Sequence, residues 1–196
     1  LENIGYIVDL GCCRIVKKLR AMRRWRDSGR ELFTISTNFS RRNFENGGDD
    51  FIERLQNTLQ RYGIDPCYIE IEVTESVIVE KLDSLKACLT RLGKLGYRIA
   101  IDDFGTGYSS LSVLLEIPAN VVKIDKSFTD KIHQNGQSAF VYQMGQFIQS
   151  AKEEVIFEGI EEEQQRTFLM ECGFNYGQGY YFDRPLPLEE FEKKYI

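Results

Sequence analysis

The sequence IAIDDFGTGYSSL, residues 99–111, joins an apolar strand to two adjacent carboxylates and a glycine-containing turn. Ile99 and Ile101 alternate with a smaller and a polar residue, which predicts a strand with one apolar face. Asp102 and Asp103 stand where this strand ends, and the two glycines that follow allow a tight turn. Neighbouring carboxylates repel each other and are costly to bury without a compensating cation. We therefore expect this pair to bind a metal ion or cationic side chains.

Composition limits the classes of protein that fit this chain. Its 196 residues, 42% apolar and 28% charged, are typical of one soluble globular domain. A net charge of −5 argues against a general DNA-binding role. Five cysteines without a C-x-x-C pair indicate reduced thiols and a cytoplasmic location. There is no membrane-length apolar run and no signal peptide, and position 1 is not Met, so we expect a piece of a longer protein.

The single histidine excludes two kinds of site. His133 is the only one in the chain, so a histidine-rich zinc site is impossible. A Ser–His–Asp triad would have to use this residue. Its polar surroundings, DKIHQNGQ, instead predict an exposed histidine in a loop or at a helix end.

Strand-like and helix-like segments alternate along the chain, which predicts parallel βαβ units and an α/β fold. We expect a TIM-like (β/α) barrel, incomplete because six such units are too few for the eight of a closed barrel. The alternative is an open doubly wound sheet, but no glycine-rich phosphate loop follows the first strand. The predicted strands span 33–38, 68–74, 99–102, 120–125, 154–158 and, more weakly, 174–182; the predicted helices span 3–28, 49–62, 80–95, 109–116, 137–152, 161–172 and the segment after 185.

Polar side chains stand at the carboxyl end of nearly every predicted strand, where barrels assemble their catalytic residues. A single strand-end acid is more often a helix cap or turn former, so the prediction depends on their repetition. Carboxylate and amide oxygens suit Mg²⁺ or Mn²⁺, with Ca²⁺ as a non-productive, inhibitory substitute. Paired acids can share two ions about 3.5–4 Å apart that activate a water and clamp a phosphodiester. The set comprises Asn38, Glu72, Asp102, Asp103, Lys123, Asp125, Glu158 and Gln178.

Lys123 is the one cation in this set, and two interpretations of it stay open. Lys123 could take a proton from the attacking water, as a neutral amine, or stabilise developing negative charge, as an ammonium. It could also be purely structural and neutralise a carboxylate in a polar core.

Six motifs in the chain resemble those of the EAL domain family. Members of this family are cyclic di-GMP-specific phosphodiesterases on a modified TIM barrel, and they hydrolyse cyclic di-GMP to linear pGpG with Mg²⁺ or Mn²⁺. The resemblance runs from the N-terminal helix to the end of the chain, and the DDFGTGYSS block is highly specific. The motifs are STNFS (36–40), IEVTES (71–76), DDFGTGYSSL (102–111), VKID (122–125), FEGIE (157–161) and QGYYFDRPLP (178–187).

The resemblance implies a role for each matching residue. Lys123 is similar to the catalytic lysine, with Asp125 beside it and Glu158 as a further acid of the centre. Glu75 resembles the glutamate that steadies the DDFGTGYSS loop, while Gln178 and Glu161 are expected near the substrate. The implied metal ligands are Asn38, Glu72, Asp102, Asp103 and Glu158.

The family's E-A-L signature is absent, and with it one metal-binding glutamate and two opening strands. Residues 1–196 are therefore expected to be a partial EAL-type domain. Besides an active phosphodiesterase, the resemblance leaves open an inactive cyclic di-GMP receptor or a protein-interaction domain. It further implies a homodimer and fusion or coupling to GGDEF or sensor domains. A fully structural set of strand-end polar residues is the remaining alternative.

Overall fold

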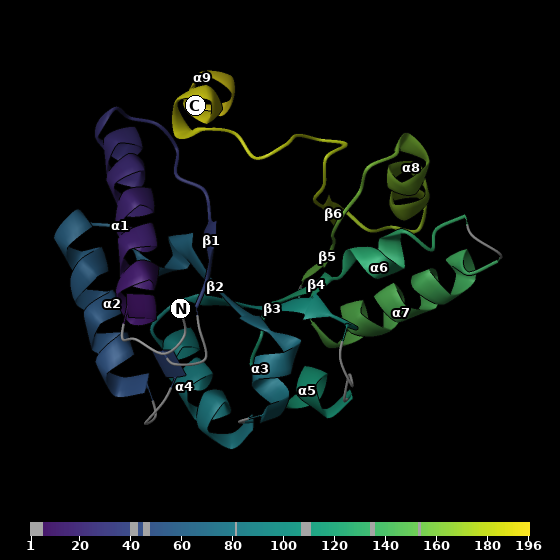
Figure 1. The fold of residues 1–196 in the computed structure, drawn as a ribbon, viewed down its shortest axis with the longest axis horizontal. Helices are drawn as coiled ribbons and strands as arrows, with labels where there is room; N and C mark the ends of the chain where they lie inside the picture. Colours follow the sequence, from purple (N-terminus) through teal and green to yellow (C-terminus); the bar gives the residue numbers. More distant parts are fainter. Residues whose placement is uncertain are drawn as a thin grey trace. The chain divides into compact units, whose positions relative to one another are not determined.

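The computed structural model describes residues 6–39, 43–44, 48–80, 82–106, 111–133, 136–152 and 154–196, in which helices and strands alternate (Figure 1). The strands are β1 (Ile35–Asn38), β2 (Ile69–Thr74), β3 (Arg98–Phe104), β4 (Val121–Ile124), β5 (Glu154–Phe157) and β6 (Tyr176–Gly177). The helices are α1 (Tyr6–Asp27), α2 (Asp49–Tyr62), the 3₁₀ helix η2 (Pro66–Tyr68), α3 (Glu75–Glu80), α4 (Leu82–Lys94), α5 (Leu111–Glu116), α6 (Lys126–Thr129), α7 (Ser138–Ala151), α8 (Glu163–Glu171) and α9 (Leu188–Tyr195).

The strands form one sheet in the order β1-β2-β3-β4-β5-β6, and the pairs β1/β2, β4/β5 and β5/β6 are parallel. Each strand therefore pairs with its neighbour in sequence, and the order never reverses. A doubly wound sheet has a switch point where the strand order reverses, whereas TIM-type winding proceeds in one direction. The predicted α/β class with TIM-like winding is confirmed, and the doubly wound alternative is not supported.

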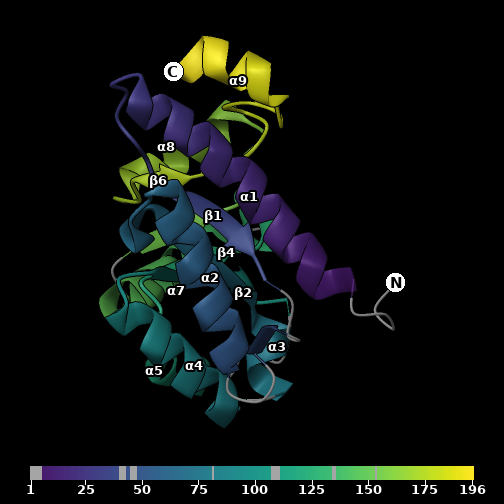
Figure 2. The same cartoon turned by 90° about the vertical axis from the view of Figure 1, so that its left-hand side faces the viewer.

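The chain divides into two compact units. The first comprises Leu1–Val73, Val77–Ala100 and Glu116–Pro118. In it, α1 and α2 pack side by side, as Figures 1 and 2 both show. Their facing surfaces are apolar at helical spacing, with Leu19 and Met22 on α1 and Leu55 and Leu59 on α2 all buried.

The second unit comprises Thr74–Ser76, Ile101–Leu115 and Ala119–Ile196. Here α7 packs against β5, and the helix buries Val141 and Ile148. The Phe157 ring of β5 lies 4.9 Å from the ring of Phe174, centroid to centroid. This aromatic pair leaves so little room that the helix carries a glycine, Gly145, where it passes over both rings.

Several predicted boundaries were wrong. The first strand begins at Ile35 rather than Phe33, and the sixth covers only β6. A turn follows β6, in which the Phe182 N–H donates a hydrogen bond of 3.1 Å to the Gly179 carbonyl. The predicted 80–95 helix corresponds to α4, whereas α3, which begins directly after β2, and α6 were not predicted.

The expected apolar face of β3, with Ile99 and Ile101, is buried, and so is its other face. Ile99, Ala100 and Ile101 are all fully buried, and Asp102 is 9% exposed. Parallel strands are covered on both faces, so alternation in sequence does not separate core from solvent.

Two further expectations agree with the described residues. His133 is exposed, and its ring contacts the edge of Phe168. Within the described segments, none of the helices combines the length and apolar character needed to cross a bilayer.

Two helical glycines should respond oppositely to alanine. A Cβ at Gly145 would lie 2.4 Å from the Phe174 ring, so Gly145→Ala should lower the free energy of unfolding by about 1–3 kcal/mol. Gly93 in α4 faces open space, so Gly93→Ala should raise it by about 0.5–1 kcal/mol through helix propensity. Urea denaturation of both variants measures these changes, and equal effects would contradict the tight packing over α7.

Candidate active site

Three carboxylates converge in the second unit. Asp102 and Asp103 come from β3, and Glu158 directly follows β5. Each contributes one oxygen, and these oxygens all lie within 4.8 Å of one another. Asp102 is buried, while Asp103 and Glu158 are half-buried. This is the convergence that the strand-end pattern predicted for these three residues.

Lys123 of β4 lies among these acids and is 6% exposed. Its Nζ is 3.5 Å from Asp102 Oδ1 and 3.6 Å from Glu158 Oε1. One ammonium therefore faces carboxylates from the strands on both sides of its own. Three acids against one lysine leave the cluster with excess negative charge when all are ionised.

The pKa values of two of these acids are raised. Burial, followed by the negative charge of Asp102, raises the pKa of Glu158 from 4.5 to about 7, although Lys123 opposes the shift. Burial and the nearby charges of Asp102 and Asp125 also raise the pKa of Asp103. Both acids are therefore harder to ionise than usual, and a bound cation would offset the cost of burying them and the repulsion between them.

The donor set of this cluster fits a divalent metal ion. The buried Oδ1 of Asp102 has the Lys123 ammonium 3.5 Å away but accepts no hydrogen bond from the described residues. Clustered carboxylate oxygens are the ligands preferred by hard ions such as Mg²⁺ and Mn²⁺. Asp102, Asp103 and Glu158 are thus the residues of the second unit that could hold such an ion.

A tight turn after β3 aims the second aspartate. Asp103 has a left-handed backbone with φ of 53°, which aspartate tolerates better than most residues. Thr106 closes the turn, because its N–H and hydroxyl both donate to the Asp103 carbonyl, at 3.3 and 2.9 Å. At Gly105, with φ of 98°, a Cβ would lie 2.3 Å from the Phe128 ring, so only glycine fits.

Glu75 holds this turn from the start of α3. It is 1% exposed, and its Oε2 accepts a hydrogen bond of 2.9 Å from the Gly105 N–H. Among the described residues, no donor reaches its other oxygen. Residues 107–110, the rest of the DDFGTGYSSL motif before Leu111, lie outside the described residues.

The other predicted residues of the second unit make contacts of different kinds. The Gln178 side-chain amide donates to Glu158 Oε1 and so orients that carboxylate. Asp125 caps α6, because its Oδ1 accepts a hydrogen bond of 2.9 Å from the Ser127 N–H. Glu161 forms an ion pair of 3.2 Å with Lys126.

Asn38 and Glu72 belong to the first unit, where they are register partners on β1 and β2. Glu72 is buried and Asn38 is exposed. Two residues earlier on β2, Glu70 accepts a hydrogen bond of 2.6 Å from the Ser36 hydroxyl and pairs with Arg98. Glu70 therefore has a structural role, as the alternative interpretation proposed for all of these strand acids.

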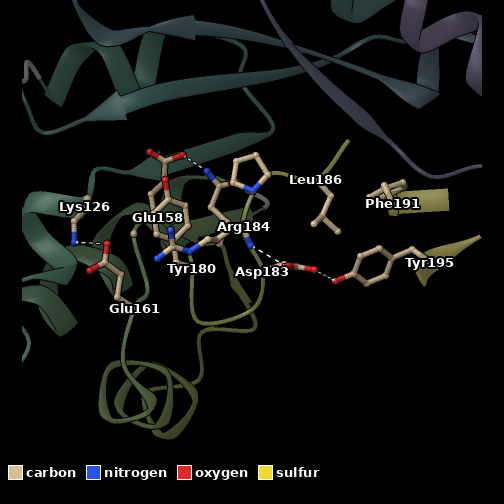
Figure 3. Close-up of a pocket in the computed structure, with 13 residues that line it drawn as sticks. Lys126, Glu158, Glu161, Tyr180, Asp183, Arg184, Leu186, Phe191 and Tyr195 are labelled. Carbon is tan, nitrogen blue, oxygen red and sulfur yellow. Dashed lines mark hydrogen bonds and ion pairs between the residues drawn. The ribbon is translucent and has the colours of Figure 1, made fainter. Parts of the chain in front are cut away.

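A cavity of about 780 Å³ in the second unit contains residues that the sequence pattern did not single out (Figure 3). Glu158, Glu161 and Gln178 line it together with Lys126, Tyr180 and Arg184. Lys126 directly follows Asp125, and Arg184 lies in the QGYYFDRPLP motif. Their position in or beside a motif is the feature of the sequence that could have identified them as cavity residues.

Comparison with known proteins places these residues in context. A family model described as "EAL domain" matches residues 1–185. The signalling protein YkoW of Bacillus subtilis is 40% identical over 98% of this chain, which spans 24% of YkoW. The cyclic di-GMP phosphodiesterase PdeR of Escherichia coli is 34% identical over 99% of this chain, which spans 29% of PdeR. The chain thus covers about a quarter of the length of these relatives.

A solved structure supports the same likeness. The PaMucR phosphodiesterase in complex with c-di-GMP superposes with a TM-score of 0.84 at 32% identity. The superposition covers 97% of this chain and 76% of the PaMucR chain.

The raised pKa of Glu158 makes stability depend on pH in metal-chelated protein. Between pH 4.5 and about 7 the folded chain holds a proton that the unfolded chain releases, so the free energy of unfolding should fall as pH rises. Glu158→Gln should flatten this decline, and Glu163→Gln on the exposed surface of α8 should not. Urea denaturation in EDTA across this range measures it. A decline of equal slope in Glu158→Gln and the parent would contradict the assignment.

Proposed function

Because this chain belongs to the EAL domain family, we propose that it hydrolyses cyclic di-GMP to linear pGpG with Mg²⁺ or Mn²⁺. The observation that carries the proposal is the cluster of Asp102, Asp103 and Glu158 around Lys123. Phosphodiester hydrolysis needs positive charge beside the phosphate and an activated water, and this cluster is suited to hold both.

We assign the metal ligands to two groups. Asp102, Asp103 and Glu158 would hold divalent ions in the second unit. Asn38 and Glu72 are proposed as ligands on the family resemblance alone. When bound, two divalent ions lower the pKa of a water and polarise the phosphate oxygens.

The chain's own residues supply orientation and charge. Lys123 stays close to two of the proposed ligands, where its ammonium would stabilise negative charge and its neutral amine would accept a proton from the water. Gln178 orients the Glu158 carboxylate through its amide hydrogen bond. Glu75 acts one step further away, through the Gly105 N–H, and keeps the turn that aims Asp103. We place Asp125 and Glu161 in supporting roles, at the start of α6 and at the cavity wall.

The proposal also covers the setting of the reaction. We propose a cytoplasmic domain that acts as a homodimer and is fused or coupled to GGDEF or sensor domains. One relative, MucR of Pseudomonas aeruginosa, is named a bifunctional diguanylate cyclase and cyclic di-GMP phosphodiesterase. Ca²⁺ is expected to bind and inhibit, because it accepts oxygen ligands at longer and more variable distances than Mg²⁺.

A turnover assay on the 196-residue chain and on a longer parent protein tests the proposal. With Mn²⁺ or Mg²⁺, we expect cyclic di-GMP to be converted to pGpG, and EDTA to abolish the reaction. Binding of cyclic di-GMP by both proteins without cleavage would favour the alternative, an inactive receptor. Absence of both binding and metal-induced thermal stabilisation would leave only a structural role for the cluster.

Asp103→Asn should reduce turnover by roughly 100-fold or more, since the neutral amide binds hard cations far less well than a carboxylate. Asp50→Asn, at an exposed position on α2, is the matched control and should keep the parental rate. Steady-state kinetics with saturating Mn²⁺ measures both. Parental activity in Asp103→Asn would show that the metal ligands are wrongly assigned.

Two substitutions at Glu75 should separate its hydrogen bond from its charge. Glu75→Ala removes the acceptor for Gly105 N–H and should lower kcat by roughly 10- to 100-fold, as for other groups that orient metal ligands. Glu75→Gln keeps an acceptor oxygen and should retain most of that activity. Rates that fall equally in the two variants would contradict an orienting role through this hydrogen bond.

A further inference from the structure

The cavity that adjoins the acidic cluster is large enough for part of a nucleotide. Its volume of about 780 Å³ is within the usual range of small-molecule sites. Glu158 belongs both to the metal-ligand cluster and to the cavity wall. A ligand whose phosphate lies at the cluster would therefore extend its remaining atoms into this cavity. Phe191 and Tyr195 of α9 line part of it, and such rings suit the packing of a base (Figure 3).

The acids that line this cavity already have partners. Glu158 faces Lys123 and Gln178, and Glu161 pairs with Lys126. Lys126 is itself shared, because its ammonium also lies 2.8 Å from Asp130 Oδ1. These pairs leave the cavity's remaining carboxylate, Asp183, as the one that could neutralise the neighbouring arginine.

Asp183 is committed to the backbone and to α9 instead. Its Oδ1 accepts a hydrogen bond of 2.9 Å from the Arg184 backbone N–H. Its Oδ2 accepts hydrogen bonds from Lys194 Nζ at 2.6 Å and from the Tyr195 hydroxyl at 2.7 Å. Asp183 therefore ties the loop to the C-terminal helix and does not form an ion pair with the Arg184 guanidinium.

Arg184 is left with uncommitted donors in a defined orientation. Its guanidinium carbon lies 4.9 Å from the centre of the Tyr180 ring, and both residues line the cavity (Figure 3). Among the described residues, the guanidinium has no ion pair or hydrogen-bond acceptor. Stacking on an aromatic ring restrains the planar group while its N–H groups stay available for a ligand.

We propose that Arg184 recognises guanine in a cyclic dinucleotide by donating two hydrogen bonds to O6 and N7 of the base. These two acceptors lie side by side on guanine and match the arginine fork. Adenine presents an amino donor in place of O6, so Arg184 would discriminate against it. The inference rests on the proposed function, since it places the phosphodiester at the acidic cluster, but it concerns specificity and not the chemical step.

Binding measurements in Ca²⁺ test this role without requiring turnover. Dissociation constants of cyclic di-GMP, cyclic di-IMP and cyclic di-AMP are compared for the parent, Arg184→Gln and Arg184→Lys. Inosine keeps O6 and N7 but lacks the guanine amino group, so it isolates the edge that Arg184 would contact. Arg166→Gln, at an arginine of α8 outside this cavity, is the matched control and should match the parent throughout.

We expect Arg184→Gln and Arg184→Lys to weaken cyclic di-GMP and cyclic di-IMP by roughly 10- to 100-fold each, with a much smaller change for cyclic di-AMP. An equal loss for all three ligands in Arg184→Gln, with recovery in Arg184→Lys, would overturn the proposal in favour of a general phosphate contact. No change in any constant would also overturn it. If the parent binds no cyclic dinucleotide, the proposed function fails first and this inference fails with it.

Discussion

The site depends on one electrostatic constraint, the close approach of Asp102, Asp103 and Glu158 around a single lysine ammonium. Burial makes these carboxylates costly to ionise, and their mutual repulsion adds to that cost. The raised pKa values of Asp103 and Glu158 express it directly. A fold that maintains this arrangement is adapted to a cation, because a divalent ion converts mutual repulsion into shared attraction. Lys123 supplies only part of the compensation.

The turn after β3 is a second requirement of the site, because it places Asp103 in a strained backbone conformation. A left-handed aspartate costs backbone energy, so it persists only where its surroundings hold it. Glu75 from α3, the Phe128 ring of α6 and the Thr106 hydrogen bonds provide that support. Each of them acts on the backbone beside Asp103 and not on its carboxylate. Support and metal binding are therefore divided between different residues.

A similar division applies to the cavity beside the cluster. Most of its charges are neutralised within the protein, through the pairs of Glu161 with Lys126 and of Asp183 with Lys194. Because Asp183 joins the loop to α9, the guanidinium next to it remains available and is restrained by Tyr180. Hydrolysis at the acidic cluster and base recognition in the cavity would thus occur in adjacent regions that share Glu158.

Local sequence was sufficient to predict the alternation of strands and helices, the α/β class and the acids at the strand ends. Hydrophobic periodicity and turn residues act over a few positions, so they can be recognised in one sequence. It could not predict that Gln178 would orient Glu158 or that the pKa of Glu158 would rise, and the role of Glu75 beside Gly105 was expected only from the family resemblance. Nor could it predict a two-residue β6 or the free donors of Arg184. These features arise from contacts and burial between residues distant in sequence, which only the folded chain brings together.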